Sequence, residues 1–435
     1  MTQGRTFLER LFYKAVAAAH PAAFLKPLLP PPPPSGRLII LAAGKAAGSM
    51  TEVAEGHYLD SFPADRLDGI AVTRHGYSRP TQKIAMVEAG HPVPDATGLA
   101  AAERTLAFAD QAGADDLVLV LISGGASANW IAPAQGLTLA EKQAVTRALL
   151  RSGASIGEIN TLRKHLSRIK GGRLARRAHP ARVVTLAISD VPGDEPAVIG
   201  SGPTVADPST LAEARAIVAR YQLDLPDSVH RALSDSANET PKPGDPIFAD
   251  STFTLAARPA DAFRAAEAEI RAAGYDCVFL GERLEGEARA VAAEHARLAR
   301  ELSAQGRKAV ILSGGELTVT LAGKGRGGPN QEYALGLCVA LDGVAGIAAL
   351  AADTDGTDGG GGAADDPAGA FVDATTISRA RAKGLDPGAF LADNNSTQFF
   401  ALLGDLLMSG PTFTNVNDFR AIVVDRPRTL AAKRL

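Results

Sequence analysis

The chain has 435 residues, of which 46% are apolar and 21% are charged, and its formal net charge is −3. This length exceeds that of one ordinary domain, so the sequence predicts two. The near-neutral charge argues against a nucleic-acid partner held by bulk electrostatics. The apolar runs are far shorter than a membrane span, and the opening residues lack the uninterrupted apolar core of a signal peptide. We therefore expect a protein of the cytoplasm.

Strand-like and helix-like patterns alternate along the first half of the chain. The opening pattern predicts a helix from Arg5 to Phe24, followed by five prolines at 30–34 that form an extended connector. The other elements predicted here are the strands Leu38–Ala42, Gly69–Thr73, Leu117–Ile122 and Val183–Ser189, and the helices Ala96–Ala112 and Leu139–Ser152, with Asp95 and Thr138 as N-caps. Near-continuous Val, Ile and Leu content is typical of parallel strands covered on both faces.

The polar, proline-rich segment at 234–246 is the best domain boundary in the chain. The elements predicted beyond it are the strands Thr252–Ala256, Cys277–Leu280, Ala309–Leu312 and Ile347–Ala351, and the helices Pro259–Ala273 and Gly286–Ala304. Strands that alternate with helices on both sides of the boundary indicate the α/β class. We predict two α/β domains with largely parallel sheets: a Rossmann-like domain over residues 1–240 and a second domain over residues 241–435.

Four loops that follow predicted strands could hold an anion. They span residues 43–45, 123–127, 189–194 and 313–316. In open α/β sheets, ligands bind beyond the carboxyl ends of the strands. A Ser-Gly-Gly turn offers a hydroxyl and two unhindered amides, although such a turn can also need glycine for its geometry alone. The recurrence favours an anionic ligand, and the predicted phosphate-binding residues are Ser123, Gly124, Gly125, Ser127, Ser313, Gly314 and Gly315.

The named nucleotide-binding motifs are absent from the sequence. It contains neither GxxxxGK[ST] nor a GxGxxG after the early strands. A kinase here would therefore be neither a P-loop enzyme nor a protein kinase, and the case for a dinucleotide-binding enzyme is weakened. The histidines show no HxxxH or HExxH spacing, so we assign no catalytic histidine.

Two cations lie in loops that suit anion binding. Lys45 directly follows a predicted strand and has small neighbours, so it could clamp a phosphate or carboxylate, or act as a base. Arg326 lies on a glycine-rich turn before a helix that Pro329 can start, and its planar fork suits a carboxylate or phosphate. For each, the alternative is a solvated surface side chain.

Further charged residues could serve a nucleotide and its metal. The basic segment from Asn160 to Arg173, which includes Lys164, could balance the charge of a triphosphate, or could be a solvated helix face that Asn160 caps. Asp190 and Asp194 flank a Pro-Gly turn after a strand and could hold Mg²⁺, which takes few protein ligands. The acidic loop at 353–359 superficially resembles a Ca²⁺ loop, but a cleft loop or structural turn is favoured.

Nine stretches, taken together, carry a resemblance to a known family. They are LAAGKAAGSM (41–50), EAGHPVPDATG (88–98), LISGGASANW (121–130), INTLRKHLSRIKGGRLA (159–175), ISDVPGDEPAVIGSGPTVAD (188–207), ILSGGELTVT (311–320), GRGGPNQEYAL (325–335), ADTDGTDG (352–359) and NNSTQFFALLGDLLMSGPTFTNVNDF (394–419). In this order they resemble the glycerate 2-kinase family, whose C-terminal part is called the MOFRL domain.

The resemblance implies two α/β domains with the active site in the cleft between them. It also implies an ATP-dependent, Mg²⁺-assisted transfer to the 2-hydroxyl of D-glycerate, giving 2-phosphoglycerate. The family's key lysine and arginine correspond to Lys45 and Arg326, and Asn330, in the same motif as the arginine, is expected to contact the nucleotide. Some members are labelled hydroxypyruvate reductases.

Our hypothesis is that Lys45 and Arg326 grip the glycerate carboxylate and the transferred phosphoryl group, while Asp190 and Asp194 organise Mg²⁺. The expected partners are glycerate and a nucleotide, without nucleic acid or membrane; the oligomeric state is left open, a homodimer included. Two alternatives are an NAD(P)H-dependent hydroxypyruvate reductase and a non-catalytic sensor of phosphorylated metabolites.

Overall fold

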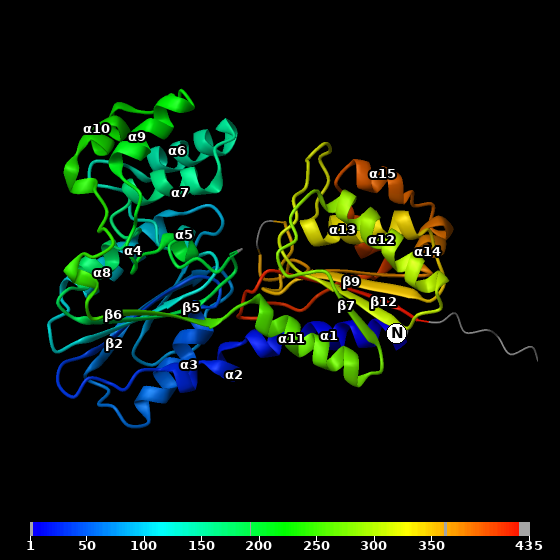
Figure 1. The fold of residues 1–435 in the computed structure, drawn as a ribbon, viewed down its shortest axis with the longest axis horizontal. Helices are drawn as coiled ribbons and strands as arrows, with labels where there is room; N and C mark the ends of the chain where they lie inside the picture. Colours follow the sequence, from blue (N-terminus) through cyan, green and yellow to red (C-terminus); the bar gives the residue numbers. More distant parts are fainter. Residues whose placement is uncertain (1–2, 192, 361–362, 426–435) are drawn as a thin grey trace, which may run out of the picture. The chain divides into compact units, whose positions relative to one another are not determined.

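The computed structural model describes residues 3–191, 193–360 and 363–425, and these form two compact units (Figure 1). The first unit is Pro21–Arg258, and the second unit combines Met1–His20 with Pro259–Leu435. The division thus falls after Arg258 rather than after residue 240, and the opening helix belongs with the C-terminal half. None of the described helices is long and apolar enough to cross a membrane.

Pairing and packing explain where the division falls. The proline-rich segment at 234–246 leads into β6 (Ser251–Ala257), which pairs in parallel with β5 (Arg182–Ile188) and so keeps the chain in the first unit. The predicted opening helix is interrupted at Pro21, giving α1 (Gln3–Ala19) and α2 (Pro21–Phe24). α1 packs in the second unit, where Phe12 contacts Phe419 with ring centroids 6.1 Å apart.

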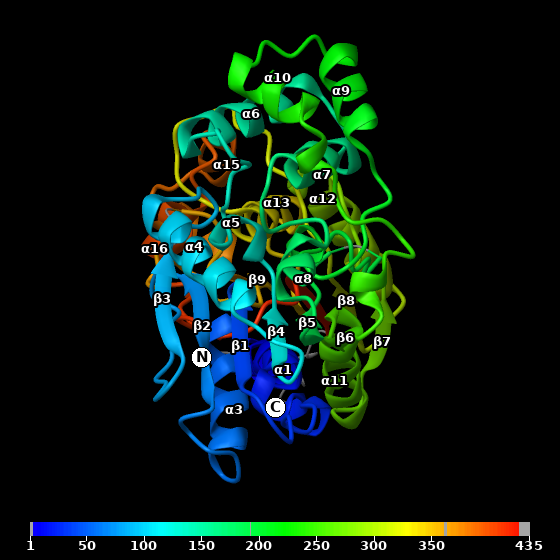
Figure 2. The same cartoon turned by 90° about the vertical axis from the view of Figure 1, so that its left-hand side faces the viewer.

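The first unit is built on a parallel sheet with the strand order β3-β2-β1-β4-β5-β6 (Figure 2). Its other strands are β1 (Leu38–Ala43), β2 (Leu67–Arg74), β3 (Ala85–Ala89) and β4 (Leu117–Ile122). Every residue of β1 and β4 is buried, because α3 (Ala47–Leu59) covers one face, while α4 (Ala96–Asp110), α5 (Ala126–Asn129) and α8 (Arg173–Ala178) cover the other (Figure 1). The predicted parallel sheet is confirmed for this unit.

A group of helices with its own apolar core lies beyond α4, α5 and α8 (Figure 1). Its helices are α6 (Leu139–Ser152), α7 (Ile156–His165), α9 (Leu211–Arg220) and α10 (Asp227–Ser234). Thr138 caps α6 and Asp95 caps α4, as predicted. The predicted cap Asn160 is wrong, because α7 already begins after Ser155, whose hydroxyl accepts from the amide of Glu158. Short 3₁₀ turns complete the unit at Lys26–Leu28, Ile199–Ser201, Ser236–Asn238 and Pro246–Phe248.

The second unit contains a mixed sheet with the order β11-β10-β9-β12-β8-β7. Its strands are β7 (Asp276–Phe279), β8 (Ala309–Ser313), β9 (Ile347–Asp353), β10 (Gly369–Asp373), β11 (Leu406–Leu407) and β12 (Asp418–Val424). Of these pairings, β7–β8 is parallel, and the sheet departs from a largely parallel one because β12 lies antiparallel between β8 and β9.

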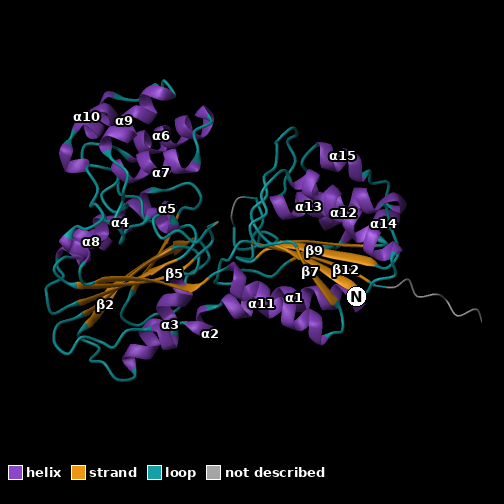
Figure 3. Ribbon diagram, viewed as in Figure 1, coloured by secondary structure: helices purple, strands orange, loops and turns teal. Residues whose placement is uncertain are grey.

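Helices cover both faces of this second sheet (Figure 3). α1 and α11 (Pro259–Ala272) lie on one face. The other face is covered by α12 (Ala288–Ala304), α13 (Pro329–Leu341), α14 (Thr376–Ala382), α15 (Pro387–Ala392) and α16 (Ser396–Leu403). Pro329 opens α13, as predicted. Both units are therefore α/β domains.

Candidate functional site

The strand order of the first unit contains a switch point between β1 and β4. These strands pair in parallel along their whole length, but the chain continues from β1 to β2 on one side and from β4 to β5 on the other. In open parallel sheets, ligands bind beyond the carboxyl ends of the strands at such a point. The residues that follow these two ends are Gly44-Lys45 and Ser123-Gly124-Gly125. The fold thus brings together two of the loops predicted to bind an anion.

Hydrogen bonds hold these two loops against each other. The amide of Lys45 donates to the carbonyl of Gly124 at 2.8 Å, and the amide of Ala46 donates to Ser123 Oγ at 2.9 Å. Ser123 is fully buried. Its hydroxyl therefore positions the backbone around Lys45, and the phosphate contact predicted for it stays a prediction.

Gly125 approaches side chains of two other loops closely. Its φ is +85°, and a Cβ there would lie 2.9 Å from Cδ2 of His91 and 3.4 Å from Cγ of Lys45. The amides of Gly124 and Gly125 make no hydrogen bond with any residue that the structure describes. Two adjacent unpaired N–H groups beside a half-buried lysine form a donor set suited to an anion.

His91 is a site residue that motif spacing did not reveal. It follows β3, whose carboxyl end lies at the same edge of the parallel sheet, and it precedes Asp95, the cap of α4. Its signal in the sequence is the stretch His-Pro-Val-Pro-Asp between a strand and a capped helix. Searching for paired histidines could not detect it, because its neighbours are Gly125 and Lys45 from other loops.

Ser127, also predicted to bind phosphate, is held by a buried lysine. Lys170 Nζ donates to the carbonyl of Ser127 at 2.5 Å and to its hydroxyl at 2.7 Å, and this hydroxyl lies 3.0 Å from that of Ser201. Burial lowers the pKa of Lys170 well below its usual value, with further contributions from the nearby cations Lys142 and Arg163.

Lys164, the basic residue chosen from the sequence, is paired inside the protein. Its Nζ lies 3.2 Å from a carboxylate oxygen of Asp207, and both side chains are buried. Asp207 also accepts from the hydroxyls of Ser209 and Thr240. This arrangement gives Lys164 a structural ion pair, and a nucleotide contact through it stays a prediction without support from these contacts.

Lys142, a buried residue of α6, should make the free energy of unfolding depend on pH. It is 3% exposed, and burial together with Arg163 and Arg173 lowers its pKa to about 7. Below pH 7 the amine is charged in both the folded and the unfolded protein, so the folded state carries the full cost of burying the charge. Between pH 7 and its ordinary value of about 10.5, the unfolded state binds more protons, so stability rises with pH.

We therefore expect Lys142→Met to stabilise the first unit at pH 6 by roughly 2–4 kcal/mol, with the gain shrinking towards pH 10. Thermal unfolding of both proteins at several pH values measures the difference. Exposed Lys83→Met is the matched control and should change the midpoint little at any pH. A gain for Lys142→Met that is the same at pH 6 and pH 10 would contradict the expectation.

Asp190 and Asp194 follow β5 at the same edge of the first sheet. Both are half-buried, and Asp194 has a φ of +56° in a turn where its amide donates to the carbonyl of Val191 at 3.2 Å; Pro192, between them, lies outside the described residues. Among the described side chains, no cluster of three or more His, Cys, Asp or Glu could hold a metal. Mg²⁺ takes carboxylate oxygens together with phosphate oxygens and water, and the role of Asp190 and Asp194 in holding the ion stays a prediction.

The second Ser-Gly-Gly loop, after β8, is occupied by packing within the second unit. Ser313 is fully buried, and the amide of Gly314 donates to the carbonyl of Gly281 at 2.9 Å. Arg420 donates to the carbonyl of Gly314 at 2.6 Å. A Cβ at Gly314 would clash with Phe263, and one at Gly315 would clash with Leu284. The tight turn therefore requires glycine, and phosphate binding by Ser313, Gly314 and Gly315 stays a prediction without support from these contacts.

Asn330 is buried in a carboxylate network at the start of α13. Its side-chain amide donates to Asp358 at 3.2 Å and to Asp418 at 2.6 Å. Asp358 also accepts from the backbone amides of Asn330 and Gln331, and burial raises its pKa to about 7. These bonds make the acidic loop at 353–359 a structural turn that caps α13, and they give Asn330 a role in that cap.

Arg326 lies on the exposed loop that leads into α13. Its Nη2 pairs with the buried carboxylate of Asp366, while 61% of the side chain remains exposed. Its carbonyl accepts from the amide of Thr397 at 2.9 Å, which fixes the backbone. Its other guanidinium donors make no hydrogen bond within the described part of the chain. The arginine is thus held from one side and presents its outer edge to solvent.

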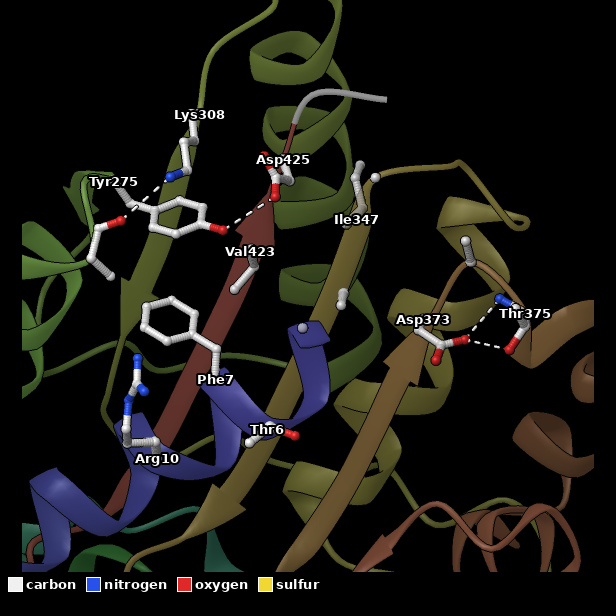
Figure 4. A pocket seen from close by; sticks show the side chains of 15 residues that line it. Thr6, Phe7, Arg10, Tyr275, Lys308, Ile347, Asp373, Thr375, Val423 and Asp425 are labelled. Atoms are coloured by element: carbon white, nitrogen blue, oxygen red, sulfur yellow. Dashed lines mark hydrogen bonds between the residues drawn. The ribbon is translucent and has the colours of Figure 1, made fainter. Parts of the chain in front are cut away.

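A large hollow of about 910 Å³ lies elsewhere in the second unit, near the amino ends of β8 and β9 (Figure 4). Several of its polar groups already have partners: Tyr275 donates to Asp425 at 3.2 Å, and Lys308 lies 4.0 Å from the centre of the Tyr275 ring. Arg10 pairs with Glu269 at 2.9 Å. None of the residues predicted from the sequence to form the site lines this hollow.

The sequence is similar to two protein families and to several named proteins. Residues 7–234 match the family described as "Domain of unknown function (DUF4147)", and residues 309–418 match the MOFRL family. The chain is 48% identical to a protein of Agrobacterium vitis named "Putative hydroxypyruvate reductase", over 97% of this chain and 94% of that one. It is 38% identical to the "D-glycerate 2-kinase" of Thermotoga maritima, over 93% of this chain and 94% of that one.

A solved structure extends the likeness to the fold. The crystal structure of a glycerate kinase from Thermotoga maritima superposes with a TM-score of 0.83 at 36% identity, covering 96% of this chain and 99% of that one. The MOFRL match lies within the second unit, and the DUF4147 match lies in the first unit apart from residues 7–20, which belong to the second. This chain therefore belongs to the glycerate 2-kinase family, in which a DUF4147 region is followed by a MOFRL region.

Proposed function

We propose that this chain is a kinase that transfers a phosphoryl group from ATP, with Mg²⁺, to the 2-hydroxyl of D-glycerate, giving 2-phosphoglycerate. The names of the relatives support glycerate as the substrate. The observation that carries the proposal is the donor set at the switch point of the first sheet. There Lys45 lies beside the unpaired amides of Gly124 and Gly125, which suit a phosphate group.

In this mechanism the protein contributes position and positive charge more than covalent chemistry. The amides of Gly124 and Gly125 and the ammonium of Lys45 bind the transferred phosphoryl group. Arg326, whose outer donors face solvent, binds the carboxylate of glycerate and so aims the 2-hydroxyl at the phosphorus. Asp190 and Asp194 would hold Mg²⁺ together with the nucleotide, and the ion would supply positive charge against the phosphates.

The test is a product-resolved assay with ATP and D-glycerate. Enolase accepts 2-phosphoglycerate and not 3-phosphoglycerate, so enolase, pyruvate kinase and lactate dehydrogenase report the proposed product directly. We expect NADH oxidation in this coupled system without added phosphoglycerate mutase. A signal that appears only with the mutase would assign the product as 3-phosphoglycerate. The absence of signal in both arms would reject the kinase.

A reductase remains the second candidate, because a 48% identical relative carries that name and the strand order 3-2-1-4-5-6 also occurs in dinucleotide-binding domains. The loop after β1 argues against it, since it carries Lys45 in place of the GxGxxG turn that lets a pyrophosphate approach the backbone. Incubation with hydroxypyruvate and NADH or NADPH distinguishes the two activities. We expect no oxidation of either nucleotide.

A further inference from the structure

Three cations in the first unit gather with no carboxylate among them. Lys142 is 3% exposed and Lys170 is 2% exposed, and Arg163 is half-buried. The three are close enough that Arg163 lowers the pKa of both lysines and Lys142 lowers that of Lys170. No carboxylate offsets these effects at either lysine. Burial without a carboxylate partner makes the charged form of both lysines costly, and a bound anion would offset that cost.

The bonds of the three cations show which of them could accept a ligand. Lys142 Nζ donates to the carbonyl of Arg163 at 3.0 Å, and Lys170 Nζ is bonded to Ser127. The side chain of Arg163, by contrast, makes no hydrogen bond or ion pair with any residue that the structure describes. Its planar fork therefore keeps its donors for a partner from outside the chain.

Neighbouring charges on the surrounding elements do not fill this role. Asp207 is engaged by Lys164, and Glu239 accepts from His165 at 3.1 Å and pairs with Lys242. Both carboxylates raise the pKa of Arg173, which donates to the carbonyl of Asn238. The charge of Arg173 in turn lowers the pKa of Lys142. Lys170, which bonds to Ser127 on the loop that follows β4, forms no ion pair with a carboxylate that the structure describes.

We propose that Lys142, Arg163 and Lys170 form an anion-binding site that takes a phosphate group beside Ser127. Arg163 binds the anion directly with its fork, Ser127 offers its half-buried hydroxyl, and the two lysines supply charge from behind. The inference deepens the proposed function and rests on it for the source of the phosphate, which is either the nucleotide or free phosphate. The sequence predicted Lys164 as the phosphate-binding residue of α7. The proposal gives that role to its neighbour, Arg163.

Titration calorimetry with inorganic phosphate, and separately with ATP, tests the site without any turnover. We expect Arg163→Gln to weaken phosphate binding roughly ten- to hundredfold, and Arg163→Lys to lose less. Arg151→Gln removes the same charge from the exposed end of α6 and should bind as the wild type does. Unfolding midpoints of all variants confirm that each is folded.

The two ligands separate the sources of the phosphate. Weaker binding of both phosphate and ATP supports the site and assigns it to the nucleotide; weaker binding of phosphate alone supports it and assigns it to free phosphate. Arg163→Gln with wild-type affinity for both ligands would overturn the proposal, whether or not the enzyme phosphorylates glycerate. Titrations at pH 8 in buffers of different ionisation enthalpy give a further readout: phosphate should draw protons onto Lys142 and Lys170, and a merely structural cluster would show no such uptake.

Discussion

Replacing Lys45 with alanine is expected to lower kcat/KM for glycerate phosphorylation by about three orders of magnitude. The side chain lies at the switch point of the parallel sheet, beside His91 and the unpaired amides around Gly125. Without the ammonium, charge that builds up on the transferred phosphoryl group loses the cation that this site supplies. The fold should survive, because the bond that fixes this loop runs from the backbone amide of Lys45 to Gly124.

The enolase-coupled assay measures this loss, and an unfolding midpoint near that of the wild type shows that the variant is folded. Exposed Lys26→Ala in the same unit is the control and should keep full activity. Lys45→Arg separates charge from shape, since the bulkier fork meets His91 and Gly125 and should restore only part of the rate. Turnover of Lys45→Ala within about tenfold of the wild type would remove Lys45 from the mechanism.

Arg326→Ala should lower kcat/KM by about two to three orders of magnitude, with a large share in the KM for glycerate. The arginine is held from one side by Asp366 and exposes the rest of its guanidinium. Loss of a bidentate carboxylate contact weakens the substrate complex and also misaligns the 2-hydroxyl, so both kinetic constants should change. Arg326→Lys keeps the charge but lacks the fork, and should recover activity only in part.

Lys324→Ala is a close control for this second variant. Lys324 is exposed on the same loop, two positions earlier, and its backbone amide bonds to Asp393 independently of its side chain. Steady-state kinetics in both substrates should show a wild-type enzyme for Lys324→Ala. If Arg326→Ala and Lys324→Ala lose activity equally, general electrostatic attraction by the loop explains the effect better than a specific carboxylate contact.

The sequence predicted the first sheet better than the second because of how each is connected. β1 and β4 are continuous apolar runs in a parallel sheet, and their predicted bounds agree with the structure within one residue. β12, which lies between β8 and β9, comes from residues 418–424 at the far end of the chain. No local sequence pattern indicates that such a strand will lie antiparallel between two others, so the mixed topology could not be predicted.

The site residues divide in a similar way. Lys45 and the loop at 123–125 could be found because each directly follows a strand end, and the strand order brings them together. The two Ser-Gly-Gly loops look alike in sequence, but the second packs against Phe263 and Leu284, which only the folded chain places there. Arg163 and Lys164 are adjacent, yet successive helix positions point about 100° apart, so one is paired with Asp207 while the other has no partner among the described residues.

α1 precedes the whole first unit in the sequence, yet it belongs to the second unit. α1 buries Leu8, Leu11 and Phe12 in a unit whose other elements begin at residue 259. During translation, the first unit can form its whole sheet before the residues that pack against α1 have been made. The apolar face of α1 is then exposed to water or to chaperones. Closing the second unit then joins segments separated by more than two hundred residues, a long-range step that should be slow compared with folding of the first unit.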